Sequence, residues 1–555
     1  PGLPAPTRAA LLRALSADPA RRFPSMEALL AAATPRRRWW PYLAGAGVTA
    51  AALGALVVTS LDRRPGCSDR GAFAWDRAGL VSALGASPTG PRVLAALEGY
   101  EGTWRAARRD SCEATRVRGE LPERVLAARL TCLDRGHRQF VELTRLVTTE
   151  PSLATTAIEA VEGLSDPRAC SPEVSPATVD PRLERARTLL LAGQEVAAIE
   201  LASAVLAGTP DLATTAEALT LRGQAEVSSE RFEAAEATLS AAVAAAEKAH
   251  ADQLVGEIWV ELLQLSGSQM HRFDAAAAHQ QAAEAAFARA EPGPSLRMAF
   301  ASAVGATALA RGDAAAARKH LEQALAADPS SRPFTRGGIL GVLCTTAVQL
   351  GDLTAGRAAC RQAIETLVAA VGPDHPAVVG TYNTWGALEL ASNDNDAALA
   401  RFGAVIETLE RTGVGDRTLA LAYSNTGLVW TRRGDLAQAR RAFARAVDLF
   451  AQHHPEHVQR TIPLQGLATI ELAEGNVAAA IAAYQEASEL SARAYGPDDP
   501  RTLSARYNVV LAHERSGDLD RAATLARELA VAAQRPGRET WPMVARALEL
   551  EARTI

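Results

Sequence analysis

Six cysteines are the residues of this chain that are best suited to chemistry, and four of them lie between residues 67 and 170. The four are Cys67, Cys112, Cys132 and Cys170. No two of them form a close C-x-x-C pair, which argues against a zinc site and favours either disulfides or buried thiols. Three connectivities are formally possible for two disulfides among four cysteines.

The sequence between these cysteines favours one of the three pairings. Helices are predicted from about 91 to 118 and from 122 to about 147, joined by a tight turn at 119–121. Cys112 and Cys132 are at nearly equal distances from this turn, so we expect them to face each other across an antiparallel hairpin. Cys67 and Cys170 would then close the ends of the module 67–170. Four free, buried cysteines remain the alternative.

The other reactive side chains do not form a site in the sequence. Cys344 and Cys360 fall at repeating core positions, so we expect packing residues rather than a redox pair. The histidines of HHPEH (453–457) lie in a connector and lack convergent ligands, which favours an exposed turn over a metal site.

Nucleotide and hydrolase motifs are also missing. The G-x-G-x-x-A stretch at 45–50 has no preceding strand and no acidic residue at ribose distance, so it does not predict nucleotide binding. The sequence contains no H-E-x-x-H, G-x-S-x-G or P-loop motif. We therefore predict no catalytic, cofactor-binding or metal-binding residue in this chain.

The composition predicts an all-α protein. Of its 555 residues, 48% are hydrophobic and only 5% aromatic, and alternating β-branched runs are nearly absent. The length indicates several domains or a repeat array. The net charge of −5 gives no reason to expect nucleic acid as a partner.

Residues 41–61 carry no charge and would span about 30 Å as a helix, the thickness of a bilayer core. The preceding linker, 35–40, contains three arginines and two tryptophans, which suit a membrane interface. The sequence thus predicts a single-pass transmembrane helix. The arginines favour a cytoplasmic N-terminal side and an extracytoplasmic, periplasmic location for everything beyond residue 61, where disulfides persist.

Small residues follow one another at four-residue spacing inside this span, at Gly47, Ala51 and Ala55. Such a stripe lets two membrane helices approach closely, which would give a homodimer contact. A generic Ala/Gly-rich span remains the alternative.

From residue 181 to 535 one pattern recurs with a spacing of 37 to 42 residues. Its turn positions are Gly193, Glu230, His271, Gly312, Gly351, Asn393, Gly434, Gly475 and Gly517. Five residues after each turn stands Ala or Gly, and nine residues after several turns stands a bulky residue such as Phe402 or Phe443. Glycine is frequent seven residues before the turn.

This pattern predicts helix pairs that cross closely at their small residues, with each bulky residue filling the next pair. The turn glycine provides a C-cap with positive φ. About nine helix pairs would then stack into one array.

The segments GDLAQARRAFARAV (434–447) and GDLDRAATLARELA (517–530) resemble the second helices of tetratricopeptide repeats. The connectors GPDHP (372–376) and GPDDP (496–500) are similar to those of the longer, kinesin-light-chain-like variety. The resemblance implies a superhelix whose concave wall binds a protein or peptide, and a capping helix at 540–553.

In this family, asparagines on the first helix of a repeat often hold the backbone of the ligand. The resemblance places Asn425 and Asn508 at this position and Asn383 one residue from it, with Arg506 near enough to meet an acidic group. Hydrogen bonds from these asparagines to neighbouring turns are the alternative.

The run L-x-A-D-P-A-R-R-F-P-S-M-E-A-L-L within residues 1–34 resembles the last helices of the C-terminal lobe of bacterial Ser/Thr protein kinases. In that family the arginine at the position of Arg22 forms a structural ion pair. CEATRVRGELPERVLAARLTCLDR (112–135) is similar to a region just outside the membrane in tetratricopeptide-bearing kinases of predatory soil (myxobacterial) bacteria. The catalytic motifs of a kinase are absent, so ATP and Mg²⁺ would belong to a domain outside this chain.

Two functions stay open. The chain is either the extracytoplasmic sensing and docking region of a membrane-anchored Ser/Thr kinase, or a stand-alone membrane-anchored tetratricopeptide scaffold. An enzyme with its own site in this chain is poorly supported.

Overall fold

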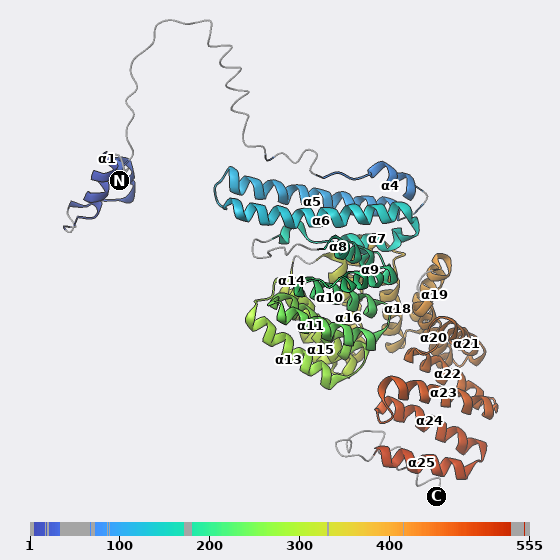
Figure 1. Cartoon of the computed structure of the whole chain (residues 1–555). Helices are drawn as coiled ribbons and strands as arrows, with labels where there is room; N and C mark the ends of the chain where they lie inside the picture. Colours follow the sequence, from blue (N-terminus) through green and yellow to red (C-terminus); the bar gives the residue numbers. More distant parts are fainter. Residues whose placement is uncertain are drawn as a thin grey trace. The chain divides into compact units, whose positions relative to one another are not determined.

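The computed structural model describes residues 5–16, 18, 21–33, 67, 73–85, 87, 89–170, 180–329, 332–413, 416–533 and 549. Every regular element in these ranges is a helix, as the composition predicted (Figure 1). The chain divides into two compact units, Pro1–Cys67 and Ser68–Ile555.

The first unit contains the two short helices that the sequence predicted, α1 (Ala5–Ala14) and α2 (Met26–Ala33). Ser25 caps α2, because its Oγ accepts a hydrogen bond from the Ala28 amide at 3.2 Å. Arg22 Nε donates to the Ser16 carbonyl at 2.8 Å. Large apolar side chains remain exposed on both helices, including Leu12 and Leu30. The kinship of this unit to a kinase lobe stays a prediction.

Several predicted elements lie outside the described residues. They are the basic linker 35–40, the membrane segment 41–61 with Gly47, Ala51 and Ala55, and the capping helix 540–553. Among the helices that are described, none combines the length and the apolar character needed to cross a membrane.

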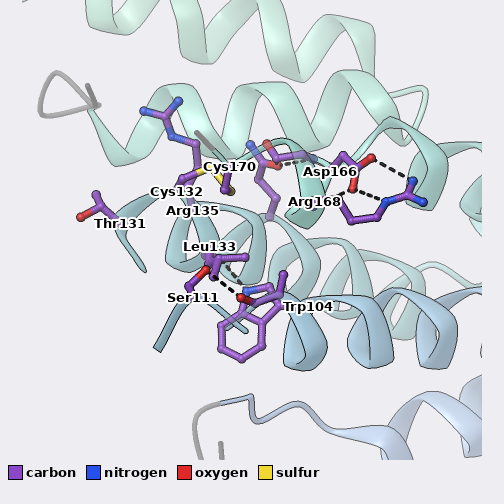
Figure 2. Close-up of a disulfide and its surroundings, with 12 residues drawn as sticks. Trp104, Ser111, Thr131, Cys132, Leu133, Arg135, Asp166, Arg168 and Cys170 are labelled. Atoms are coloured by element: carbon purple, nitrogen blue, oxygen red, sulfur yellow. Dashed lines mark hydrogen bonds and ion pairs between the residues drawn. A yellow bond between two sulfur atoms is a disulfide. The ribbon is translucent and has the colours of Figure 1, made fainter. Parts of the chain in front are cut away.

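The second unit begins with a helical hairpin. α5 (Gly90–Arg116) and α6 (Glu123–Thr149) run antiparallel, close to the predicted bounds, and are preceded by α4 (Arg77–Leu84) and followed by α7 (Ala154–Gly163) (Figure 1). The turn between α5 and α6 contains Gly119 at φ +66°. Trp104 is fully buried, and its Nε1 donates to the Leu133 carbonyl of α6 at 2.7 Å (Figure 2). This hydrogen bond satisfies the one polar atom of the largest core side chain.

The disulfide pattern of this module differs from the predicted one. Cys132 of α6 is joined to Cys170, with their Cα atoms 5.7 Å apart (Figure 2). The predicted 112–132 and 67–170 pairings are therefore wrong. The described residues contain no free cysteine, so Cys67 and Cys112 are also disulfide-bonded.

Between residues 180 and 533 the described helices form nine consecutive pairs. In chain order, the first and second helices of each pair are α8 (Pro181–Leu191) and α9 (Glu195–Ala207), α10 (Leu212–Ser228) and α11 (Phe232–Lys248), α12 (Asp252–Gln264, continued by a π-helical turn at Leu265–Gln269) and α13 (Phe273–Arg289), α14 (Pro294–Arg311) and α15 (Ala314–Ala327), α16 (Pro333–Leu350) and α17 (Leu353–Val371), α18 (Pro376–Ala391) and α19 (Asn395–Thr412), α20 (Asp416–Arg433) and α21 (Leu436–His453), α22 (Thr461–Ala473) and α23 (Val477–Tyr495), and α24 (Pro500–Ser516) and α25 (Leu519–Ala533).

All nine predicted turn positions have a positive φ, between 53° and 92°. Six of them are glycines, which adopt this conformation without a steric penalty. The three exceptions are Glu230, His271 and Asn393. The turn position of every pair thus requires a positive φ, whether or not its residue is glycine.

The predicted close crossing is also present. A β-carbon on Gly427 of α20 would lie 2.6 Å from ring atoms of Phe443 on α21, and one on Gly386 of α18 would lie 2.5 Å from Phe402 on α19. The bulky residue therefore fills the glycine gap of its own pair, not only that of the next pair as expected. Phe443 does both, because it also meets Gly466 on α22.

Cys344 and Cys360 are both fully buried in the fifth pair, as expected for packing residues. They are nevertheless joined in a disulfide between α16 and α17, so the prediction that they do not form a pair is wrong.

The hairpin module and the fifth and sixth pairs share one hydrophobic core. This core joins Trp104 and Phe140 of the module to Leu367 and Val371 of α17 and Val378 of α18. Polar contacts accompany it: Arg332 Nη2 donates to the Leu164 carbonyl at 2.6 Å. The module is thus part of the same folded body as the repeats.

Candidate functional site

The first helices form the inner side of the curved array. Most neighbouring first helices pack directly on one another, for example α16 on α18 and α18 on α20. Among the described residues, neighbouring second helices have no contact of similar extent. Because a stack curves toward the side on which its members are closer, the first helices form the concave wall.

Two of the predicted asparagines lie together on this wall. Asn425 Nδ2 of α20 donates to Asn383 Oδ1 of α18 at 3.3 Å. Asn508 of α24 makes the equivalent bond two helix pairs further along, to Gln465 Oε1 of α22 at 3.4 Å. All of these amides are only half-buried. Each amide pair therefore keeps donors and acceptors free for a ligand backbone.

Polar side chains also join the first helices at the other end of the array. Arg187 of α8 pairs with Glu217 of α10 at 3.2 Å, and Gln224 of α10 donates to Glu261 of α12 at 3.2 Å. These residues escaped the sequence analysis. The available signal was a polar residue recurring at about one repeat length on successive first helices.

Two carboxyls of α12 have raised pKa values. The surrounding protein desolvates Glu261 and raises its pKa, partly offset by its hydrogen bond from Gln224, and the charge of Glu257 raises it further. Desolvation also raises the pKa of Glu257, and the charge of Arg187 opposes this shift. The Glu257 side chain itself is exposed, so its desolvation comes from the protein around the concave wall and not from enclosure of the side chain. A cation placed between these carboxyls would stabilise their charged forms.

Arg506 of α24 lines a cavity of about 320 Å³ between α23, α24 and α25. Apolar side chains of Val509, Leu525 and Leu529 also line this cavity, together with Glu489, Glu528 and Arg521. The lining of the cavity therefore combines side chains of both charges with apolar side chains. The role of Arg506 in meeting an acidic group stays a prediction.

The histidines of HHPEH line a larger cavity of about 650 Å³, opposite His271. His457 Nδ1 accepts the Gln459 amide at 3.2 Å, so it caps the short helix that follows. Within the described ranges, no group of three or more His, Cys, Asp or Glu side chains is arranged to hold a metal ion.

Residues 298–553 match the family described as MalT-like TPR region. No curated protein matches the sequence. Among solved structures, a Rap protein complexed with competence and sporulation factor has 12% identity and a TM-score of 0.41, with 67% of this chain and 96% of that chain covered. Yeast Tom70 has 14% identity and a TM-score of 0.38, with 77% and 96% covered.

A third similar structure is a signal transduction ATPase with numerous domains and a tetratricopeptide repeat sensor, from Pyrococcus horikoshii. It has 14% identity and a TM-score of 0.41, with 75% of this chain and 66% of that chain covered. At these identities the similarity concerns the fold alone. Together with the nine helix pairs, the family match means that the chain contains a tetratricopeptide-like (TPR-like) repeat region with an all-α, superhelical fold.

Proposed function

We propose that the TPR-like region binds an extended peptide or partner segment along its first helices, as the protein-interaction and sensor region of a membrane receptor. The observation that carries this proposal is the row of paired polar side chains that join consecutive first helices, Asn425 with Asn383 and Asn508 with Gln465. Amides on consecutive first helices can hold peptide groups that lie about three residues apart in an extended ligand.

The two carboxyls of α12 favour a ligand that carries a basic residue. Glu257 and Glu261 have raised pKa values, and a lysine or arginine side chain beside them would restore their ordinary ionisation. We therefore expect ligands that carry a basic residue over the third helix pair and an extended backbone over the sixth to ninth pairs.

An array of extended peptides, probed with the full chain, tests this proposal. Asn425→Ala should weaken binding of the selected peptides by roughly fivefold, the value of one hydrogen bond of about 1 kcal/mol. The double variant Glu257→Gln, Glu261→Gln should lose selectivity for basic peptides. Gln438→Ala, exposed on the second helix α21, is the matched control and should bind normally. Selection of peptides that none of these inner-wall variants affects would contradict the proposal.

The finer proposal is that the region belongs to a membrane-anchored Ser/Thr kinase, with residues 41–61 as the membrane helix and the repeats in the periplasm. Disulfides inside the hairpin module and the fifth repeat support it, because disulfides persist in oxidising compartments. Protease added to spheroplasts should then cleave the repeats but not the first unit. Full protection of the repeats would contradict this topology.

Kinase parentage is supported by the resemblance of residues 1–34 to a kinase C-terminal lobe and by the apolar side chains that α1 and α2 leave exposed. The sequence encoded upstream of Pro1 tests it: in-frame H-R-D and D-F-G motifs are expected. Their absence would favour the stand-alone membrane-anchored scaffold.

A further inference from the structure

Two side-chain contacts join helix pairs that are far apart in the sequence. Glu230, in the turn between α10 and α11, accepts a hydrogen bond from Arg417 Nη1 at the start of α20, at 3.1 Å. His271, in the turn before α13, has its ring centroid 5.2 Å from that of Tyr495 at the end of α23. The second and third pairs therefore touch the seventh and eighth pairs along what we call the seam, defined by these four residues.

Both turn residues of the seam break the glycine rule of the repeats. Glu230 has φ 57° and His271 has φ 53°, a left-handed conformation that is unfavourable for a residue with a β-carbon. The third exception, Asn393, belongs to a residue type that tolerates this conformation, and it bonds Arg432 of the adjacent pair at 3.0 Å instead. Two of the three turn residues that are not glycine thus make contacts across the seam.

The seam is weakly closed. Between its two contacts lies the cavity of about 650 Å³, which residues 230–233 and 269–272 line from one side and 453–458 from the other. Both partners of the Glu230–Arg417 ion pair are nearly half-exposed, so solvent screens this pair and it contributes little to holding the two sides together.

The contact of His271 with Tyr495 places an imidazole beside a guanidinium of the opposite side. Arg501 stacks on the Tyr495 ring, with its Cζ 3.5 Å from the ring centroid, and pairs with Asp499 at 2.9 Å. Burial lowers the pKa of His271, the charge of Arg501 lowers it further, and Asp499 opposes both. His271 Nδ1 is buried and has no hydrogen-bond partner among the described residues.

A second imidazole, His457, lines the cavity from the same side as Arg417. Burial lowers its pKa, and the charges of Arg417 and His454 lower it further, whereas Glu230 across the seam opposes them. Protonated His457 would attract Glu230, so His457 does not favour opening. The remaining titratable and charged groups that face the cavity are Glu233, Arg272, His453, Glu456 and Arg493. Arg272 pairs with Glu236, and Arg493 pairs with Glu456, so these charges largely cancel.

We propose that the seam is an acid-released clasp, in which protonation of His271 beside Arg501 of the opposite side separates the two sides without unfolding the helices. The sign follows from linkage. A group that binds its proton more weakly in the closed form than in the open form shifts the equilibrium toward the open form as the pH falls. The clasp would change access to the concave wall, whatever ligand that wall binds.

Energy transfer between two fluorophores on the full chain tests this proposal. The exposed residues Ala237 on α11 and Gln452 on α21 are suitable positions for non-natural amino acids that carry the dyes. Transfer should fall between about pH 7.5 and about pH 5.5, the range in which an ordinary histidine titrates, while helical circular dichroism stays constant. Constant transfer, or a loss of transfer only together with loss of helicity, would overturn the proposal.

Variants separate the clasp from general acid sensitivity. His271→Phe keeps a ring beside Tyr495 but cannot take up a proton, so its transfer should not change with pH. His271→Gly with Glu230→Gly removes both turn side chains and should give low transfer at both pH values with normal helicity. His457→Asn, which keeps the cap acceptor, and Asn393→Gly are the matched controls and should respond to acid like the unmodified chain. A His271→Phe variant that still opens in acid would overturn the assignment to this imidazole.

Discussion

Gly427 of α20 lies so close to Phe443 of α21 that even a methyl group would meet its ring at 2.6 Å. Gly427→Ala should therefore destabilise the repeats by about 1–3 kcal/mol, although alanine is the better helix former. The midpoint of urea unfolding measures this loss. An unchanged or higher midpoint would mean that Phe443 can move aside at no cost.

Gly403 is the control for this prediction. It lies on the exposed face of α19 with no atom within 4 Å of an added β-carbon. Gly403→Ala should raise the urea midpoint, since it gains helix propensity of up to about 1 kcal/mol without a steric clash. We therefore expect the same substitution to lower the stability at position 427 and to raise it at position 403.

His375 gives the fold a specific pH dependence. It is 6% exposed, its Nδ1 accepts the Ala377 amide at the start of α18, and burial lowers its pKa to about 4. The unfolded chain binds this proton near pH 6.5, so stability should fall as the pH drops below about 6.5, by about 2 kcal/mol at pH 5.

His375→Asn tests this prediction, because asparagine retains a cap acceptor but does not titrate. Its stability should change less between pH 7 and pH 5 than that of the unmodified chain, as measured by urea unfolding at both values. The comparison leaves Glu159, 3.9 Å from His375 Nε2, unchanged in both proteins. Equal pH dependence in the two proteins would contradict the role of His375.

Single positions were predictable from the sequence where they repeat. The turn positions recur once per helix pair, and all of them have the positive φ that the pattern predicted. The contacts of Glu230 and His271 were not predictable, because they join residues 187 or more positions apart and no period links the partners. The hydrogen-bonded pair of Gln465 and Asn508 was predictable only in part, since the sequence identified Asn508 as a candidate and did not identify Gln465.

At the scale of elements, the hairpin of α5 and α6 was predicted well and its disulfide was not. Equal distance from a turn places Cys112 and Cys132 at the same height along the two helices. It does not fix their angle around each helix axis, and that angle decides which neighbour a side chain faces. Cys132 faces the segment after α7, where Cys170 lies (Figure 2).

The Cys132–Cys170 disulfide ties the second hairpin helix to the end of the module, with a sequence separation of 38 between the two cysteines. Peptide mapping without reduction should find a peptide that links 132 to 170 and none that links 112 to 132. Replacing both Cys132 and Cys170 by serine should cost about 2–4 kcal/mol, seen as a lower urea midpoint. A linked peptide containing 112 and 132 would contradict this connectivity.

At the scale of the whole second unit, the hairpin module and the middle of the array behave as one body. Phe334 N donates to Glu162 at 3.0 Å, and α17 contributes Leu367 and Val371 to the core of the module. Hydrogen exchange should therefore protect α17 together with α5 and α6, and more strongly than α25 at the far end of the array. Equal exchange in α17 and α25 would contradict the shared core.

The repeat pattern predicted the stacking of neighbours because each pair contacts the next at a fixed interval. It could not predict that the module packs against the fifth and sixth pairs, since the stacking rule concerns nearest neighbours only. Glu162 and Phe334 are 172 residues apart, and nothing in either segment identifies the other as its partner.

This separation has a consequence for biosynthesis. A ribosome adds roughly 10 residues per second, so the module emerges on the order of 20 seconds before α17 and α18 do. During that interval the apolar surface later covered by Leu367, Val371 and Val378 has no native partner in the nascent chain. Synthesis of this protein therefore passes through a stage in which a chaperone would protect the newly made hairpin from aggregation.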